Sequence, residues 1–323
     1  MFASPAAGVS RAFPGNGYRQ IEETVDLREP FCFALHSSIF NLEKHRLPYH
    51  YNQNCWRTQI QFESASVIPI EVLPDSPRRT AGLNLVIYSE LSSAERKDIT
   101  NLVKAVFCTD ATLGKIPEGA GSEVFESLAS GFAGLKPHLS QDPFQSLIKI
   151  LVRQMIGAEQ AKRIITRITT TFGLVSTIGD KEFNSFPTPV RLSRATKHEL
   201  LKSGVGFKWR YIRQVARLVR DGDLDFSELN KLSDDKALDA LKEIAGIGQW
   251  SAEVFLFDGM HRLGVYPTFD ITIQRALEQL SVRTEVPKAD LENRLNEFDG
   301  GCKGIFATYL FAYFRESKRL EQG

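Results

Sequence analysis

The pair of glycines in Gly246-Ile247-Gly248 constrains the fold of this chain more than any other feature. Apolar residues recur at helical spacing from Ala237 to Ile244, and again from Ser251 to Met260. Glycine reaches backbone angles that are closed to residues with a Cβ, and it lets the main chain approach another backbone closely. The pattern therefore predicts two short helices joined by a glycine hairpin, with Ile247 filling the gap between them.

The start of the second helix is a candidate anion site. Its first N–H groups have no partner inside the helix, and the positive end of the helix dipole points the same way. Ser251, in the first turn, could cap the helix or donate to the same anion. An ordinary helix-turn-helix connection that stops at a glycine remains the alternative interpretation.

A single carboxylate follows the hairpin at a second helix start. Pro267 blocks continuation of the preceding helix, and apolar residues from Ile273 to Leu280 begin a new one just after Asp270. We therefore expect Asp270 at or near a helix N-terminus. The competing interpretation is an N-cap aspartate whose side chain only accepts bonds from backbone N–H groups.

Together these motifs resemble a known superfamily. Gly246 to Ala252, followed by Phe269 to Leu277, resembles the helix-hairpin-helix DNA glycosylases, specifically the AlkA-like branch, 3-methyladenine DNA glycosylase II. Further motifs occur in the branch's order: Asp142-Pro143-Phe144, the turn Arg153 to Gly157, Phe186 to Pro189, and the glycine-basic helix Gly204 to Gly222. The resemblance covers residues 140 to 320 closely and the N-terminal part in outline.

The resemblance implies removal of a damaged base without cleavage of the DNA backbone. Superfamily members that also cleave the backbone carry a nucleophilic lysine two residues after the second hairpin glycine, and here that residue is Trp250. Asp270 would stabilise the positive charge that develops on the deoxyribose, and it could also orient or deprotonate the attacking water. Alkylated purines of the 3-methyladenine and 7-methylguanine type are the expected substrates. A glycosylase for 8-oxoguanine or deaminated bases, and a non-catalytic helix-hairpin-helix DNA-binding protein, remain alternatives.

The target base has to leave the duplex before reaction, and the resemblance assigns residues to this step. Met155 aligns with the intercalating wedge, although a methionine filling a gap between helices fits as well. Trp250 would stack on the extruded base and attract a cationic one. Tyr313 matches another pocket aromatic, with a core tyrosine as the alternative. Val254 and Ile271 replace tyrosines of the best-known member, so the pocket is less aromatic.

Charge supports DNA as the partner when it is counted locally. The whole chain has a net charge of +1, but residues 145 to 220 hold 15 Lys and Arg against 4 Asp and Glu, a difference of 15 − 4 = +11. Basic residues concentrated on a helical segment suit contacts to phosphates that do not depend on base sequence. The expected DNA-binding residues are Gly246, Ile247, Gly248, Gln249, Ser251, Lys208, Arg210 and Arg153.

No cofactor is expected to be required. By resemblance, the hairpin could hold a monovalent cation, sodium or potassium, on the backbone carbonyls of Lys242, Ile244 and Ile247. The four cysteines are scattered without metal-ligand spacing, which argues against an iron–sulfur cluster, a zinc site or a disulfide framework: Cys32, Cys55, Cys108 and Cys302. This cysteine usage fits a reduced compartment, the cytoplasm or a nucleus.

The expected architecture is mostly α-helical with an N-terminal α+β domain. Residues 1–20 are expected to form a loose tail and 21–91 a small antiparallel sheet with a helix. One helical lobe, 141–262, would contain the hairpin, and a second would combine 92–140 with 263–323. A catalytic cleft would separate the lobes, with Asp270 at their junction. We expect a monomer that acts on damaged double-stranded DNA and does not enter a membrane.

Overall fold

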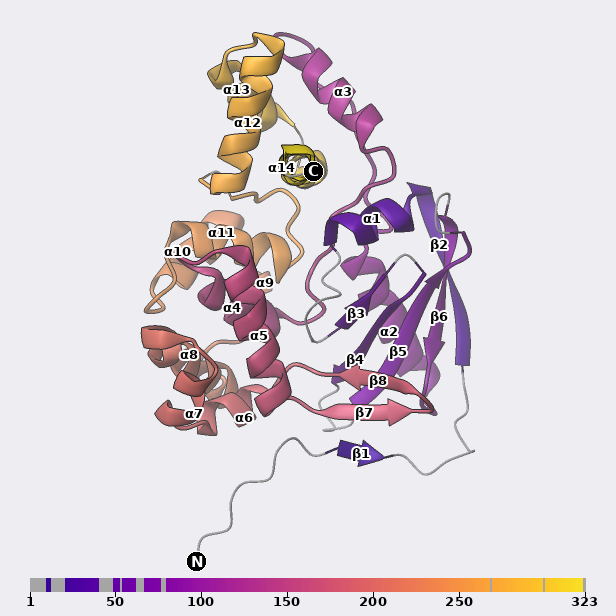
Figure 1. Ribbon diagram of the computed structural model, residues 1–323, viewed down its shortest axis with the longest axis vertical. Helices are drawn as coiled ribbons and strands as arrows, with labels where there is room; N and C mark the ends of the chain where they lie inside the picture. Colours follow the sequence, from indigo (N-terminus) through magenta and orange to yellow (C-terminus); the bar gives the residue numbers. More distant parts are fainter. Residues whose placement is uncertain are drawn as a thin grey trace, which may run out of the picture.

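Three hydrophobic cores organise the computed structural model, which describes residues 10–12, 21–40, 49–52, 54–61, 67–76, 80–267, 269–298 and 300–321. One core lies in the N-terminal part and the other two lie in helical lobes (Figure 1). The described chain is mainly helical with a small N-terminal antiparallel sheet, so the predicted fold class is confirmed.

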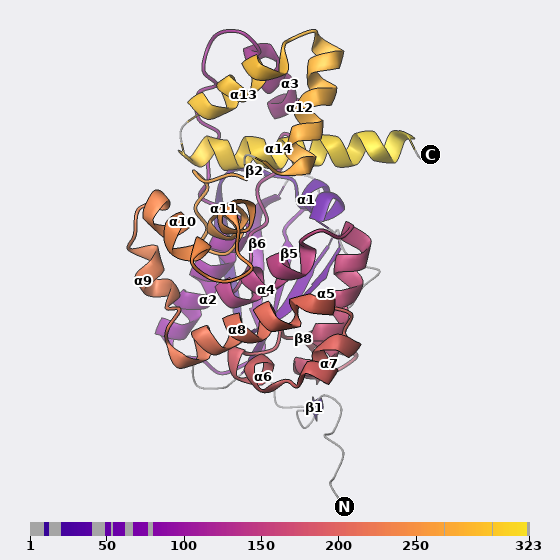
Figure 2. The same cartoon turned by 90° about the vertical axis from the view of Figure 1, so that its left-hand side faces the viewer.

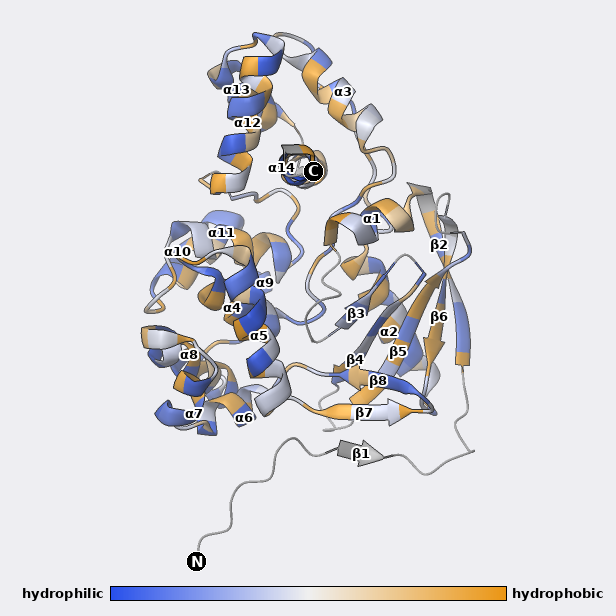
Figure 3. Ribbon diagram, viewed as in Figure 1, coloured by the Kyte–Doolittle hydropathy of each residue, from blue (hydrophilic) through white to orange (hydrophobic). Residues whose placement is uncertain are grey.

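The N-terminal core lies between a sheet and a helix. The sheet has the order β2-β6-β5-β4-β3 and its strands are antiparallel throughout. Orange, hydrophobic stretches run along its central strands (Figure 3). The strands are β2 (Ile21–Phe31), β3 (Tyr49–Tyr51), β4 (Trp56–Gln61), β5 (Val67–Pro74) and β6 (Thr80–Ile87), and the helices of this part are α1 (Phe33–Phe40) and α2 (Ser93–Val106).

Helix α2 does not lie where the sequence suggested. It was expected in the second helical lobe, but its buried residues Ile99, Val103 and Val106 pack in the N-terminal core. Hydrophobic spacing predicted the helix correctly, but spacing does not say which core a helix covers. The N-terminal core therefore extends to Phe107.

A second, three-stranded sheet has the order β1-β7-β8. It joins β1 (Ser10–Ala12) in parallel to β7 (Val175–Ile178), which pairs with β8 (Lys181–Asn184). Residues 10–12 therefore form a strand instead of the expected loose tail, and the rest of that tail lies outside the described residues. The β7–β8 hairpin interrupts the lobe 141–262, which was expected to be helical, within a region expected to be nearly all helix.

The first helical lobe contains the glycine hairpin. Its core spans Phe144 to Val265, and Asp142 caps its first helix by accepting a bond from the amide of Gln145 at 2.6 Å. Its helices are α4 (Pro143–Arg153), α5 (Ala158–Phe172), α6 (Pro189–Arg194), α7 (Lys197–Lys202), α8 (Trp209–Asp221), α9 (Phe226–Asn230), α10 (Asp234–Lys242) and α11 (Gln249–Asp258), with a short 3-10 helix at Gly206–Lys208.

The second helical lobe joins two distant parts of the chain. It consists of α3 (Ser122–Gly131), α12 (Ile271–Thr284), α13 (Lys288–Glu297) and α14 (Gly300–Glu321). Val265 belongs to the first lobe's core and Tyr266 to the second's, so the chain crosses between lobes just before α12. Helix α14 runs beneath α12 and α13 (Figure 2). Among the described residues, no helix is both long and apolar enough to cross a membrane.

Candidate functional site

The hairpin between α10 and α11 is shaped by one glycine in particular. Gly246 has a φ of +91°, and a Cβ there would lie 2.6 Å from Cγ of Tyr211. Only glycine lets the Tyr211 ring lie this close to the turn. Ile247 is buried between the helices, and Gly248, the N-cap of α11, is exposed and makes no side-chain cap bond. Helix α11 therefore begins at an exposed residue, and its first amides lie next to solvent.

Two polar residues of the hairpin are committed to neighbours within the protein. Ser251 is buried, and its hydroxyl accepts a hydrogen bond from Nε2 of Gln154 at 2.9 Å. The expectation that this hydroxyl contacts an anion is therefore wrong, because it lies beneath the helix start. The exposed Gln249 donates from Nε2 to Oε1 of Glu253 at 2.8 Å.

Asp270 stands at the lobe junction as the N-cap of α12. Its Oδ1 accepts the amides of Thr272 at 2.8 Å and Ile273 at 3.4 Å. Its Oδ2 accepts the indole N–H of Trp250 at 3.0 Å, so the first lobe contributes a donor as well. The carboxylate is half-buried. It is thus both a helix cap and one end of an interlobe hydrogen bond.

Trp250 lies in the first turn of α11 and contributes a hydrogen-bond donor to the site in addition to its aromatic ring. The half-buried side chain orients the carboxylate through its N–H. Tryptophan donates from a single nitrogen and accepts nothing, so this bond uses its whole hydrogen-bonding capacity. A spacing argument could not anticipate the contact, since the two residues lie on separate helices.

The turn between α4 and α5 presents Met155 to solvent. Its side chain is 94% exposed and its φ is +55°, which is unusual for a residue with a Cβ. This placement does not fit the alternative of a methionine that fills a gap between helices. Arg153, at the end of α4, is also exposed.

Lys208 is not at the surface. Only 5% of it is exposed, and its ammonium donates to the carbonyls of Val152, at 2.8 Å, and Gln154. The expectation that Lys208 reaches a DNA phosphate is therefore wrong. The side chain of its neighbour Phe207 is 64% exposed. The sequence did not predict this exposed aromatic, because a single aromatic residue in a glycine-rich turn forms no recognisable pattern.

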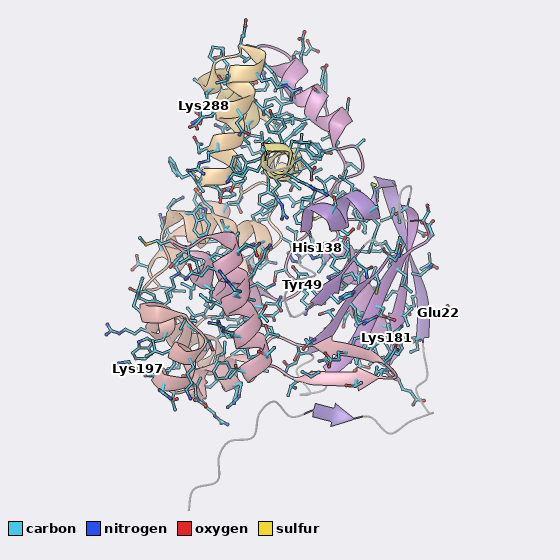
Figure 4. The ribbon with its side chains drawn as sticks, in the orientation of Figure 1. Glu22, Tyr49, His138, Lys181, Lys197 and Lys288 are labelled. Atoms are coloured by element: carbon cyan, nitrogen blue, oxygen red, sulfur yellow. The ribbon has the colours of Figure 1, made fainter. Side chains whose placement is uncertain are left out.

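Arg210 belongs to a cluster of cations around one indole. The ring centroid of Trp209 lies 5.7 Å from Cζ of Arg210, 5.0 Å from Cζ of Arg213 and 5.5 Å from Nζ of Lys197. Lys197 lies at the lower edge of the first lobe (Figure 4). Arg210 is exposed and lines a surface pocket of about 310 Å³ together with Arg213 and Arg217. Its guanidinium thus remains available to a phosphate.

The expected base-pocket residues are only partly brought together. Val254 lies on α11, one turn after Trp250, and is half-buried, while Ile271 is exposed next to Asp270. Tyr313 instead lines a surface pocket of about 410 Å³ with Gln279 and Val282, near the far end of α12. The pocket that Tyr313 lines therefore does not include Asp270. Phe311, also on α14, stacks on Phe40 of α1, with ring centroids 6.3 Å apart.

The carbonyls proposed for a monovalent cation lie at the end of α10 and in the hairpin. The carbonyl of Ile244 accepts the amide of Ile247 at 3.0 Å, which leaves it a second lone pair. The ammonium of Lys242 pairs with Asp239 at 2.8 Å. Carbonyl oxygens are suitable ligands for a hard cation.

The part of the chain that holds the hairpin is similar to known proteins. Residues 148–298 match the family described as "HhH-GPD superfamily base excision DNA repair protein". The chain is 24% identical over 213 residues to a "Probable N-glycosylase/DNA lyase" of Methanothermobacter thermautotrophicus, a match that covers 59% of this chain and 67% of that one. It is 23% identical over 279 residues to the "DNA-3-methyladenine glycosylase" of Bacillus subtilis, covering 84% and 91% of the two chains.

A solved structure agrees in fold. The chain is similar to the "3-methyladenine dna-glycosylase from Archaeoglobus fulgidus", with a TM-score of 0.76 and 21% identity over 91% of this chain and 98% of that one. At this identity the likeness establishes the shared fold alone. Residues 148–298 therefore match the HhH-GPD family of base excision repair proteins, and the similar proteins include both 3-methyladenine glycosylases and a glycosylase/lyase.

Proposed function

Since residues 148–298 match the HhH-GPD family of base excision repair proteins, we propose that the chain is a monofunctional DNA glycosylase for alkylated purines. The observation that carries this proposal is the arrangement of Asp270 and Trp250 at the lobe junction, beside an exposed hairpin. The enzyme would hydrolyse the N-glycosidic bond of an extruded 3-methyladenine or 7-methylguanine. It would act as a monomer wherever genomic DNA is accessible.

Asp270 would act mainly through its charge. Breaking the glycosidic bond leaves positive charge on the deoxyribose, and a fixed carboxylate nearby stabilises that transition state. The donors from Trp250, Thr272 and Ile273 fix the direction of the carboxylate. Three donors already occupy acceptor positions of the carboxylate, which leaves fewer positions for a water molecule.

Met155 would fill the space that the extruded base leaves. Inserting an apolar side chain between base steps compensates for part of the cost of unstacking, which is a few kcal/mol. Its full exposure on a turn supports this role.

The hairpin would grip the strand through the first amides of α11. The exposed residues Gly248 and Gln249 offer backbone N–H groups at the positive end of the helix dipole. A sodium or potassium ion on the carbonyls of Lys242, Ile244 and Ile247 would add positive charge facing a phosphate. Arg153 and Arg210 would supply further phosphate contacts.

The proposed absence of lyase activity rests on Trp250. An indole cannot form a Schiff base with the sugar, so attack falls to water. Borohydride trapping on a duplex with an abasic site tests this point: we expect no covalent adduct. A stable adduct would mean that a lysine elsewhere attacks the sugar.

The substrate class is tested by base release from a panel of duplexes. We expect release of 3-methyladenine and 7-methylguanine from methylated DNA. Because the similar proteins include an N-glycosylase/DNA lyase, the panel also contains 8-oxoguanine, uracil and hypoxanthine. Release of one of these alone would reassign the pocket, and DNA binding without any release would favour a non-catalytic binding module.

A further inference from the structure

A single polar network joins the two turns proposed to contact DNA. One turn holds Met155, between α4 and α5, and the other is the hairpin from Gly246 to Gly248. Gln154 and Lys208 link them, and neither residue is used by the mechanism described above.

Lys208 supports the first turn from below. Its ammonium, with the residue 5% exposed, donates to two carbonyls at the end of α4, those of Val152 and Gln154. These carbonyls carry the negative end of the helix dipole. Burial lowers the pKa of Lys208, so the charge is held at a cost. An apolar side chain would fill the same space without that cost, which suggests that the bonds themselves are needed.

Gln154 passes the connection to the hairpin. Its backbone carbonyl accepts from Lys208, while its side-chain Nε2 donates to the carbonyl of Gly246 at 2.7 Å and to Oγ of Ser251 at 2.9 Å. One residue is thus bonded on both sides. The hairpin cannot shift relative to the α4–α5 turn without breaking one of these bonds.

Met155, the next residue, has a backbone conformation that needs such support. A φ of +55° is disfavoured for any residue with a Cβ, and such a conformation persists only where its surroundings fix it. The side chain itself is 94% exposed, so it provides almost none of that support. The bonds made by the preceding residue fix the direction in which Met155 projects.

We propose that Lys208 and Gln154 are positioning residues that couple base extrusion to binding of the DNA strand by the hairpin. They would do so by holding the Met155 side chain at a fixed position relative to the hairpin amides. This rests on the proposed glycosylase function. When a duplex binds the hairpin, Met155 would then already lie at the base step into which it inserts. Extrusion would not require a further rearrangement of the two turns. Loss of either residue would leave strand binding intact and would impair extrusion.

The test uses the full chain and two separate readouts. Duplexes carry 2-aminopurine at a central position, whose fluorescence rises when the base leaves the stack, and anisotropy measures binding to the same duplex. The variants are Lys208→Met and Gln154→Leu, with Lys202→Met, an exposed lysine on α7, as the matched control. Thermal unfolding of each variant reports on folding.

We expect each variant to lower the extrusion equilibrium about tenfold at similar affinity, the size expected when a hydrogen bond is lost. In a Met155→Ala background, Lys208→Met should have little further effect, because it acts through the wedge. An equal loss of binding and extrusion would indicate a purely structural role and overturn the proposal. The proposal would also be overturned if neither variant changed extrusion, or if the effects of Lys208→Met and Met155→Ala on extrusion were additive. The same holds if the wild type produced no rise in fluorescence. Base release from methylated DNA is measured separately, so failure of the proposed function would be recognised independently.

Discussion

The indole N–H of Trp250 donates to Oδ2 of Asp270 at 3.0 Å, across the junction between the two helical lobes. The other oxygen of Asp270 accepts two amides of α12, so donors from both lobes hold the carboxylate. A carboxylate fixed in this way pays little reorganisation cost when positive charge develops beside it. Trp250 thereby positions Asp270, whatever its ring contributes to base stacking.

Trp250→Phe separates these two roles, because it keeps an aromatic ring and removes the N–H. We expect the single-turnover rate of base release to fall about tenfold, in line with a lost hydrogen bond to a charged group, with little change in DNA affinity. The control is Trp209→Phe, which removes an indole N–H on α8. An unchanged rate would show that the bond to Asp270 has no part in the reaction.

Arg153→Ala and Arg210→Ala test the phosphate contacts. Each exposed guanidinium that neutralises one phosphate should lower the slope of log affinity against log salt by about 0.9 when removed. Arg319→Ala, an exposed arginine near the end of α14, should leave the slope unchanged. Fluorescence anisotropy at several salt concentrations provides the measurement. Slopes equal to that of the wild type would remove both arginines from the interface.

Glu71 is predicted to stabilise the packing of the β7–β8 hairpin against the N-terminal sheet. The buried carboxylate pairs with Nε of Arg57 at 2.8 Å and Nζ of Lys181 at 2.7 Å, and Lys181 lies beside that sheet (Figure 4). The side chains of Arg57 and Lys181 are 20% and 38% exposed, so Glu71→Gln should lower the free energy of unfolding by about 1.5–3 kcal/mol, the contribution of a hydrogen bond to a charged group. Glu118→Gln, in an exposed pair with Lys115, should cost less than about 1 kcal/mol. Denaturant titration distinguishes the two, and equal effects would contradict the prediction.

Acid is predicted to destabilise the protein through two histidines, His36 and His138. Burial lowers the pKa of His36 to about 3, and burial together with the nearby charges of His36 and Lys149 lowers the pKa of His138 well below 6.5. Below pH 6.5 the unfolded chain binds protons that the folded one does not. Stability is therefore complete above pH 6.5 and falls towards pH 3, by up to about 1.4 kcal/mol per pH unit for each histidine.

The variant His138→Phe checks this pH dependence. It suits the aromatic surroundings, where the His138 ring stacks on Tyr51 with centroids 5.4 Å apart and lies near Tyr49 (Figure 4). Thermal unfolding between pH 7 and pH 4 should show a shallower loss in the variant. An identical pH profile would mean that His138 takes up protons equally in both states.

Local patterns predicted the helices, the hairpin and the N-cap position of Asp270, because spacing and cap chemistry are local. They failed where the answer depends on tertiary contacts. The packing of α2 against the N-terminal sheet, the burial of Lys208 and the hydroxyl partner of Ser251 all involve residues far apart in the sequence. Lys208 is instructive: a lysine in a basic run is usually solvated, and only the free carbonyls at the end of α4 explain its burial.

The placement of Tyr313 could not be predicted for a related reason. Resemblance assigned it by alignment to the base pocket, but the rotation of α14 about its axis turns it towards Gln279 and Val282. On a helix, a shift of two positions moves a side chain to a different face. Phe311, two residues earlier, faces α1 instead and stacks on Phe40.

The most direct test of the account is base release from methylated DNA by the wild type and by Asp270→Asn under single-turnover conditions. Asparagine keeps the shape of the N-cap and can still accept bonds, so folding and DNA binding should persist. The account predicts a fall in the rate of release of about 10²–10³, the loss expected when one fixed electrostatic contact to the transition state is removed. Release by Asp270→Asn at the wild-type rate would contradict it.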